Sequence, residues 1–400
     1  MNLLMVGWAS SEQQAGGVES IQKDMVDRLG ARFVDVREAA RELGVEVGRY
    51  QRHANIDRAC MLAEYVERLE ENQSFDAVIA AADAGAMLHT KAPLVLYWHN
   101  PYRDIADHLH RQGSYDRSKW YEYAKQYPAL EEHGGRRAFA NVAVSSWMRG
   151  YLGRCRTRAD SVIPLGIDPE VFSPGSPGER GRIRLSLGLP PNQPVVLFSG
   201  AFHPVSGFAT VHRLAAQHPE WSFLYVFKER KPQDPLLLGT ADVRFPESGP
   251  NCCVLDCLPR SAMAAVYRAA DVMVSASPIE SFNLKAIEAL ASGTPVVTTR
   301  AGVFADWPES GPFGVVCGTG DVEDMAAGIE RVLAGEAGTN PRSAVVPYFT
   351  LDRFERDWRA LLGRVVDRDH REVRPRALHL RSLVAARTIG GHAQVHRTPK

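Results

Sequence analysis

Two glutamates within one short apolar stretch are the residues of this 400-residue chain best suited to chemistry. Glu280 and Glu288 stand in SPIESFNLKAIEALASGTPVV, residues 277–297, where most other side chains are small or apolar. The spacing predicts a helix from about Asn283 to Gly293 with apolar residues around nearly its whole circumference, so we expect it to be buried. A carboxylate there needs an ion pair or hydrogen bonds, because a lone buried charge costs several kcal/mol.

The amino terminus of this helix offers a second kind of chemistry. The peptide N–H groups of residues 282–284 have no partner inside a helix that begins there, so they favour a bound anion or hydroxyl group. Two interpretations of the glutamates stay open from the residues alone. In the first, Glu280 offsets the positive helix end and Glu288 pairs with Lys285. In the second, vicinal hydroxyl groups of a ligand satisfy both carboxylates.

Short apolar segments that read as strands alternate with helix-period segments along the chain, which predicts parallel sheets wrapped by helices. The segment VIPLGIDPEVFSPGSPGERG (162–181) is rich in Pro and Gly, as an interdomain linker would be. Two such α/β halves imply a cleft, with ligands beyond the carboxyl ends of the strands. The predicted strands are NLLMVG (2–7), DAVIAA (76–81), PLVLYW (93–98), NVAVSS (141–146), PVVLFSG (194–200), SFLYVF (222–227), CCVLDCL (252–258), DVMVSAS (271–277) and TPVVTT (294–299).

Length and composition limit the class of protein. Four hundred residues exceed one ordinary core, which indicates two domains. Lys+Arg and Asp+Glu number 47 each, so the charge gives no reason to expect a nucleic-acid partner. The apolar run in MNLLMVGWASS is short for a signal peptide and lacks a basic flank. No stretch approaches the ~18 apolar residues of a membrane span, so we expect a cytoplasmic protein without integral membrane contact.

The stretch ESFNLKAIEALASGTPVV is similar to the Glu-x7-Glu motif and following Gly-x-Pro-Val-Val of retaining glycosyltransferases with the GT-B fold, in the large family usually numbered four. A Gly16–Gly17 turn, His99 after an apolar strand, the hinge IPLGIDPEVFSP and an amphipathic closing helix fit the same family in order. The similarity covers roughly residues 1 to 365.

The resemblance implies α/β architecture of the GT-B type, with two Rossmann-like parallel-sheet domains facing across a cleft. Residues 1–166 would form the acceptor-binding domain and residues 167–348 the nucleotide-sugar-binding domain. Residues 349–366 would form a helix that crosses back onto the first domain. Residues 367–400 lie beyond the resemblance, and their many Arg residues and weak periodicity favour a mobile basic tail, with a binding arm as the alternative.

The resemblance also implies a role for each matching residue. Glu288 would hold the ribose hydroxyl groups of a nucleotide-sugar donor, Glu280 would contact the donor sugar near its reacting centre, and His99 would face that sugar from the other domain. The residues expected to contact the donor are Gly17, His203, Lys228, Arg230, Leu258, Glu280, Ser281, Phe282, Asn283, Leu284 and Glu288. Among them Glu280 and Lys228, together with His99, are expected to be catalytic, and the residues expected at the acceptor are Gly16, Gly17, Tyr102 and Arg103.

The chain departs from this family at one point. The family has an Arg and a Lys after the first strand of the second domain, and those cations grip the diphosphate. SGAFHPVSGF has Ala201 and Ser206 at these positions. Lys228 and Arg230 follow the next predicted strand. We hypothesise that Lys228, assisted by Arg230 or His203, stabilises the leaving group, although a basic solvated loop is the alternative.

The implied function is that of a retaining hexosyltransferase, which moves a sugar from a nucleoside-diphosphate sugar to an acceptor hydroxyl group. A front-face displacement is expected, because no side chain stands out as a covalent nucleophile. No metal or cofactor is expected, since no apolar strand ends in Asp-x-Asp and Cys252, Cys253 and Cys257 form no Cys-x-x-Cys pair. The strong preference for Arg over Lys associates the chain with bacterial natural-product or glycan biosynthesis.

Two other functions stay open. A sugar phosphorylase or hydrolase would use Glu280 and Glu288 as an acid/base pair, although a junction between loop and helix controls the separation of two carboxyl groups poorly. A non-catalytic nucleotide-sugar-binding relative would have kept the fold after losing the cations at Ala201 and Ser206. The acceptor, the donor sugar and its base are not specified by these residues.

Overall fold

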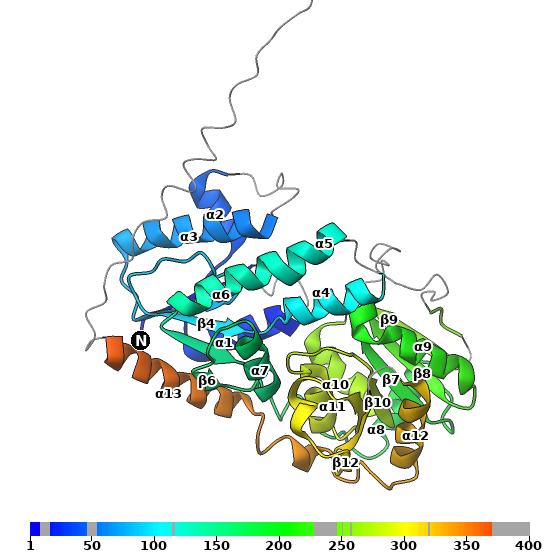
Figure 1. Cartoon of the computed structure of the whole chain (residues 1–400). Helices are drawn as coiled ribbons and strands as arrows, with labels where there is room; N and C mark the ends of the chain where they lie inside the picture. The colour runs from blue at the N-terminus through cyan, green and yellow to red at the C-terminus, as the bar shows by residue number, and fades with distance from the viewer. Residues whose placement is uncertain are drawn as a thin grey trace, which may run out of the picture.

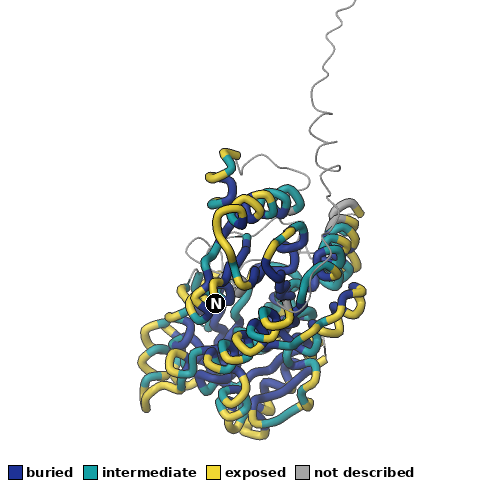
Figure 2. Tube along the Cα trace, turned by 90° about the vertical axis from the view of Figure 1, so that its left-hand side faces the viewer, coloured by how far each residue is buried: buried dark blue, intermediate teal, exposed yellow. Residues whose placement is uncertain are grey.

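The computed structural model describes residues 1–8, 17–45, 54–113, 117–227, 246–249, 251–256, 258–318 and 321–369. The described chain forms two α/β domains, each built on its own sheet (Figure 1). In both sheets the central strands are buried and the surrounding helices carry the exposed residues (Figure 2). Helices therefore cover both faces of each sheet, as the alternating pattern predicts.

The first domain contains a six-stranded parallel sheet in the order β2-β1-β3-β4-β5-β6. Every residue of β3 and β4 is buried, which explains their continuously apolar sequences. The strands are β1 (Leu3–Val6), β2 (Arg32–Val34), β3 (Ala77–Ala81), β4 (Leu94–Trp98), β5 (Ala140–Ala143) and β6 (Ser161–Val162).

The helices of the first domain begin and end at local signals in the sequence. Asp35 caps α2 by accepting hydrogen bonds from the N–H groups of Arg37 and Glu38, and Gly44 ends the helix in the left-handed conformation. The helices are α1 (Gly17–Leu29), α2 (Val36–Leu43), α3 (Ala54–Asn72), α4 (Tyr102–Arg111), α5 (Arg117–Tyr121), the π-helix η1 (Glu122–Gln126), α6 (Tyr127–Arg137) and α7 (Ser146–Arg154).

The second domain contains a seven-stranded sheet in the order β12-β13-β11-β10-β7-β8-β9, in which β12 runs antiparallel to β13. Its strands are β7 (Val195–Gly200), β8 (Ser222–Phe227), β9 (Cys252–Asp256), β10 (Val272–Ser275), β11 (Val296–Thr299), β12 (Ser310–Gly311) and β13 (Gly314–Cys317). Its helical segments are α8 (Glu179–Ser186), η2 (Pro204–Ser206), α9 (Phe208–Gln217), α10 (Arg260–Ala269), α11 (Leu284–Ala291), η4 (Gly302–Asp306), α12 (Val322–Leu333) and η5 (Arg342–Ala344).

The last described helix, α13 (Leu351–Asp369), returns to the first domain and lies along its α1 side (Figure 1). Trp358 of α13 is buried and packs edge-on against Tyr97 of β4. Arg28 of α1 donates a hydrogen bond to Asp352 at 2.9 Å. The helix runs to Asp369, so the predicted boundary between helix and tail at residue 366 was too early. Residues 370–400 lie outside the described residues.

Candidate functional site

The turn that starts α11 is set by the backbone conformation of Asn283. This residue is buried and has φ +80° and ψ +54°, a left-handed conformation that Asn tolerates better than most residues. Its Nδ2 donates a hydrogen bond to Ser275 Oγ at 2.9 Å, which fixes the turn to β10. Within the described chain the N–H groups of residues 282–284 donate no backbone or side-chain hydrogen bond. The start of α11 therefore keeps the donors expected for an anion or hydroxyl site.

Glu280 lies on the loop between β10 and α11, and Lys285 reaches back toward it from the first turn of the helix. The distance from Lys285 Nζ to Glu280 Oε1 is 3.7 Å, and both side chains are partly exposed. The alternative in which Lys285 pairs with Glu288 is therefore wrong. Lys285 lies near the loop that carries Glu280, whereas the Glu288 side chain is buried inside the domain.

The partners of Glu288 come from another helix, α10. Arg260 Nε donates to Glu288 Oε1 at 2.7 Å, and the Tyr267 hydroxyl group donates to Oε2 at 3.0 Å. Burial raises the pKa of this carboxyl group, which is only 6% exposed, while the Arg260 guanidinium opposes that rise. A carboxylate accepts about four hydrogen bonds, so about two positions remain for ligand hydroxyl groups.

Arg260 also binds the first domain. Its Nη1 lies 2.7 Å from Asp24 Oδ2 on α1, so one guanidinium joins a buried carboxylate of the second domain to a helix of the first. The sequence interpretation missed Arg260, Tyr267 and Asp24. The available signal was a basic residue at the start of the helix after β9, at the carboxyl end of the sheet.

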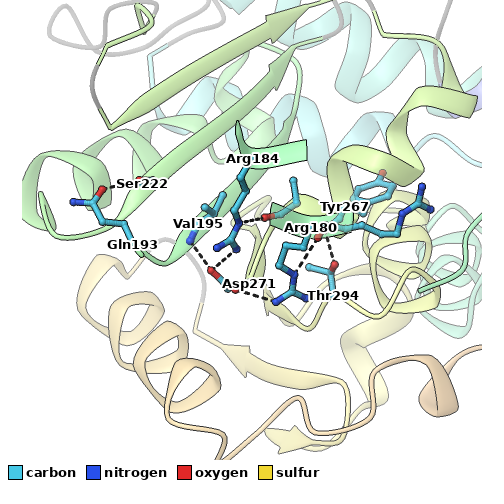
Figure 3. Close-up of polar contacts among 10 residues, drawn as sticks. Arg180, Arg184, Gln193, Val195, Ser222, Tyr267, Asp271 and Thr294 are labelled. Carbon is cyan, nitrogen blue, oxygen red and sulfur yellow. Dashed lines mark hydrogen bonds and ion pairs between the residues drawn. The ribbon is translucent and has the colours of Figure 1, made fainter. Parts of the chain in front are cut away.

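A second group of ion pairs holds the opposite end of β10 (Figure 3). Asp271, just before β10, accepts hydrogen bonds from Arg184 at 2.6 Å and from the Val195 N–H group at 2.8 Å. Nearby, Thr294 donates to the Tyr267 carbonyl oxygen at 2.6 Å (Figure 3). These contacts support the helix that presents Tyr267 to Glu288.

The first domain contributes a polar network at the carboxyl ends of β3 and β4. His99 is 5% exposed, stacks on Tyr97 with ring centroids 4.9 Å apart, and has Nε2 3.2 Å from Asn100 Nδ2. Asn100 Nδ2 also donates to the Tyr102 oxygen at 3.2 Å, and the Tyr102 hydroxyl group donates to Asp83. The network connects His99 with the start of α4.

Glu131 of α6 adds a buried carboxyl group near this network. It is 2% exposed, and its Oε2 has no hydrogen-bond partner within the part of the chain that the structure describes. Burial and then the nearby charge of Asp83 raise its pKa well above the ordinary value. Burial therefore favours the protonated form of Glu131, and its place in a helical segment gave no signal of this in the sequence.

The other candidate residues are spread along both domains. Gly17 opens α1, Leu258 lies between β9 and α10, and Ser281 accepts a hydrogen bond from Ser145 Oγ through its carbonyl oxygen at 2.6 Å. The Arg103 guanidinium donates to the Arg154 carbonyl oxygen at 3.4 Å.

At the position of the missing cations, Ser206 Oγ donates to the His203 carbonyl oxygen at 2.7 Å, and His203 Nδ1 accepts from the Val205 N–H group at 3.3 Å. Ala201 is exposed beside them. Neither side chain at 201 or 206 supplies a cation. The remaining candidates Gly16, Lys228 and Arg230, together with Cys257 of the cysteine cluster, lie outside the described residues.

Two general properties of the described ranges bear on the class of protein. Within them no group of three or more His, Cys, Asp or Glu side chains is arranged to hold a metal ion. None of the helices in the same ranges is both long and apolar enough to cross a membrane.

The arrangement of two parallel-sheet domains and a final helix that crosses back to the first is the GT-B fold. Sucrose-phosphate synthase from Thermosynechococcus elongatus superposes with a TM-score of 0.73 at 18% identity, covering 92% of this chain and 100% of that one. Anabaena Alr3699/HepE, in complex with UDP and glucose, superposes with a TM-score of 0.69 at 19% identity, covering 91% of this chain and 99% of that one. The predicted fold class is confirmed.

Residues 193–335 match the family model described as Glycosyl transferases group 1. D-inositol 3-phosphate glycosyltransferase of Mycobacterium sp. (strain KMS) is 32% identical over 227 residues, which are 55% of this chain and 50% of the relative. That of Mycolicibacterium smegmatis is 34% identical over 194 residues, 47% of this chain and 43% of the relative. The chain thus spans about half the length of the curated relatives it matches. The match to the group 1 model falls within the second domain of a chain with the GT-B fold.

Proposed function

We propose that this chain is a retaining glycosyltransferase that moves a sugar from a nucleoside-diphosphate sugar to an acceptor hydroxyl group. One observation carries the proposal. Glu288 accepts hydrogen bonds from Arg260 and Tyr267. It lies on the same short helix whose N-terminal amides, close in sequence to Glu280, have no hydrogen-bond partner among the described residues, and both glutamates lie in the domain that matches the group 1 model. The names of the relatives and the UDP bound by the Anabaena neighbour support a nucleotide-sugar donor.

The donor would lie along α11. The ribose hydroxyl groups would use the two remaining acceptor positions of Glu288, and the diphosphate would lie at the amides of residues 282–284. The donor sugar would lie between Glu280 and His99. Glu288 needs little rearrangement to bind, because Arg260 and Tyr267 already fix both of its oxygens.

The leaving diphosphate needs positive charge, and neither residue 201 nor residue 206 provides it. The described cation at this edge is Lys285, 3.7 Å from Glu280. Lys228, with Arg230 or His203 assisting, stays our hypothesis for the main counter-charge. Together with the helix amides these cations would stabilise charge that develops on the phosphate as the glycosidic bond breaks.

The proposed reaction is a front-face displacement without a metal ion. The bond from the anomeric carbon to the diphosphate oxygen breaks while the acceptor oxygen bonds to the same face of that carbon. The acceptor proton passes to the departing phosphate oxygen. Water must be excluded from such a site, and contacts between the domains, including the hydrogen bond from Ser145 to Ser281, would close it.

The acceptor would bind against the first domain, near His99, Tyr102 and Arg103. We keep bacterial natural-product or glycan biosynthesis as the proposed setting. D-inositol 3-phosphate, the compound in the names of the matched relatives, is the first acceptor to test.

The test is a transfer assay on the full chain in EDTA with UDP-, GDP-, ADP- and dTDP-sugars and D-inositol 3-phosphate or other polyols. The expected result is release of the nucleoside diphosphate together with a product of the same anomeric configuration as the donor. Release of a free sugar phosphate would instead favour a phosphorylase. Nucleotide-sugar binding without transfer to any acceptor would favour the non-catalytic relative.

A further inference from the structure

Arg260 joins two residues that have different expected roles. Its Nε contacts Glu288, the expected ribose ligand, at 2.7 Å, and its Nη1 contacts Asp24 of α1 at 2.7 Å. Asp24 lies seven residues after Gly17, about two helical turns from the end of α1 that is expected at the donor phosphate. The Arg260 guanidinium therefore links Glu288, the expected ribose ligand, to α1, whose first residue is expected near the donor phosphate.

The surroundings of Arg260 make these ion pairs stronger than surface pairs. The side chains of Arg260 and Asp24 are 28% and 19% exposed, and that of Glu288 is 8% exposed. The guanidinium lies over the Phe172 ring, 5.5 Å from its centroid, and Nη2 is buried without a hydrogen-bond partner among the described residues. A charge in such a place interacts strongly with its neighbours and is costly to leave unpaired.

We propose that Arg260 is a positioning residue that couples occupation of the ribose site at Glu288 to docking of α1, and with it the first domain, on the second domain. This inference rests on the proposed function, because the ribose role of Glu288 belongs to it. When α1 is docked, Asp24 holds the guanidinium in the position that orients Glu288. When a nucleotide fixes Glu288, Arg260 is held ready for Asp24, since coupling between two equilibria acts in both directions.

The coupling predicts an effect from a residue that contacts no ligand. Asp24→Asn removes the charge on α1 and leaves Glu288, Arg260 and Tyr267 in place. We expect it to weaken nucleoside-diphosphate binding roughly tenfold. Arg260→Gln should weaken binding at least as much, and the double variant should add little to Arg260→Gln, because both changes interrupt the same connection.

The same helix provides a matched control. Arg268 of α10 pairs with Glu179 at 2.9 Å, with side chains 19% and 26% exposed, but both residues belong to the second domain. Arg268→Gln therefore removes an ion pair of similar exposure without touching the domain contact. We expect it to change nucleotide affinity less than about twofold, even if it lowers the melting temperature.

The experiment is calorimetric titration of the full chain and its variants with UDP, GDP, ADP and dTDP, together with X-ray scattering with and without the nucleotide that binds best. Weaker binding in Asp24→Asn and Arg260→Gln, a larger radius of gyration in both, and neither effect in Arg268→Gln would support the coupling. If Arg260→Gln fails to fold, Arg260→Lys replaces it, because one ammonium group lacks the forked geometry that serves both carboxylates.

Unchanged affinity in Asp24→Asn, when the unmodified chain binds a nucleotide, would overturn the coupling and leave the proposed function intact. Failure of the unmodified chain to bind any of the four nucleotides would overturn both. A lower melting temperature with unchanged affinity and radius of gyration would assign Arg260 a purely structural role and would also overturn the coupling.

Discussion

The Ser145 hydroxyl group in the first domain donates a hydrogen bond to the Ser281 carbonyl oxygen in the second domain at 2.6 Å. Ser145 Oγ also accepts a hydrogen bond from the Met148 N–H group at 3.1 Å and so caps α7. Ser281 directly follows Glu280. One hydroxyl group therefore both starts a helix of the first domain and fixes the loop that carries a proposed catalytic carboxylate.

Ser145→Ala should reduce both stability and sugar transfer. Loss of the cap costs about 1 kcal/mol of unfolding free energy, and loss of the contact with Ser281 releases the loop at Glu280. The control is Asp35→Ala, which removes the cap of α2, far from the cleft. Urea unfolding and initial transfer rates check both variants. The interpretation is wrong if the two variants lose stability equally and Ser145→Ala transfers sugar as fast as Asp35→Ala.

Tyr267→Phe should raise the KM for the donor about fivefold and leave kcat nearly unchanged. The variant loses the 3.0 Å hydrogen bond to Glu288, worth about 1 kcal/mol, but keeps Arg260. Tyr225→Phe is the matched control, because the Tyr225 hydroxyl group is buried on β8 and the described ranges give it no hydrogen-bond partner. Steady-state kinetics with varied donor check the prediction. Equal effects of the two substitutions would show that Tyr267 does not orient Glu288.

Glu131→Gln should stabilise the protein at high pH. Burial and then Asp83 raise the pKa of Glu131 in the folded protein, whereas the unfolded chain releases the proton near the ordinary pKa of 4.5. The stability contributed by the protonated group is therefore complete below pH 4.5 and is lost as pH rises toward the folded-state pKa. Gln cannot ionise, so the variant should be more stable than the unmodified protein at pH 8, with little difference at pH 4.

Glu355→Gln provides a control of opposite sign for this pH series. The hydrogen bond from Arg359 lowers the pKa of Glu355, so its stabilising contribution is present above the ordinary pKa of 4.5 and disappears as pH falls below it. The variant should lose stability at pH 8 and none at low pH. Urea unfolding of both variants at pH 3, 4, 6 and 8 gives the two trends. A pH-independent effect of Glu131→Gln would contradict its assignment as a buried protonated group.

Lys228→Ala should lower kcat about tenfold or more, because the proposed leaving-group charge loses its main cation. Lys91→Ala is the control, since Lys91 lies in the first domain and donates to the Glu70 carbonyl oxygen. Initial rates at saturating donor and acceptor check both. Unchanged turnover and donor affinity in Lys228→Ala would move the role to another cation, of which Lys285 is placed beside Glu280.

Much of the fold follows from local sequence patterns. Continuous apolar runs such as LVLYW predict buried parallel strands, and β4 is buried at every position. The helix expected from about Asn283 forms as α11, with Asn283 as its cap. These features depend on residues close together in the chain, so periodicity and turn chemistry are enough to predict them.

The partners of Glu288 were beyond such reasoning. Arg260 is 28 positions from Glu288 and 236 positions from Asp24, so their contacts depend on how three helices pack. Local spacing offered Lys285 as a partner of Glu288, and that pairing is wrong. A residue three positions away on a helix is close enough to pair, but tertiary packing decides whether it does. Glu131 was missed for the same reason, since its burial depends on tertiary packing of α6.

The central claim is that a nucleoside diphosphate binds along α11, and a crystal structure of the chain with the best-binding nucleotide tests it most directly. The account predicts ribose hydroxyl groups within hydrogen-bond distance of Glu288 and the terminal phosphate at the amides of residues 282–284, with Arg260 still bridging Glu288 and Asp24. A nucleotide bound elsewhere, or one whose ribose does not contact Glu288, would contradict it.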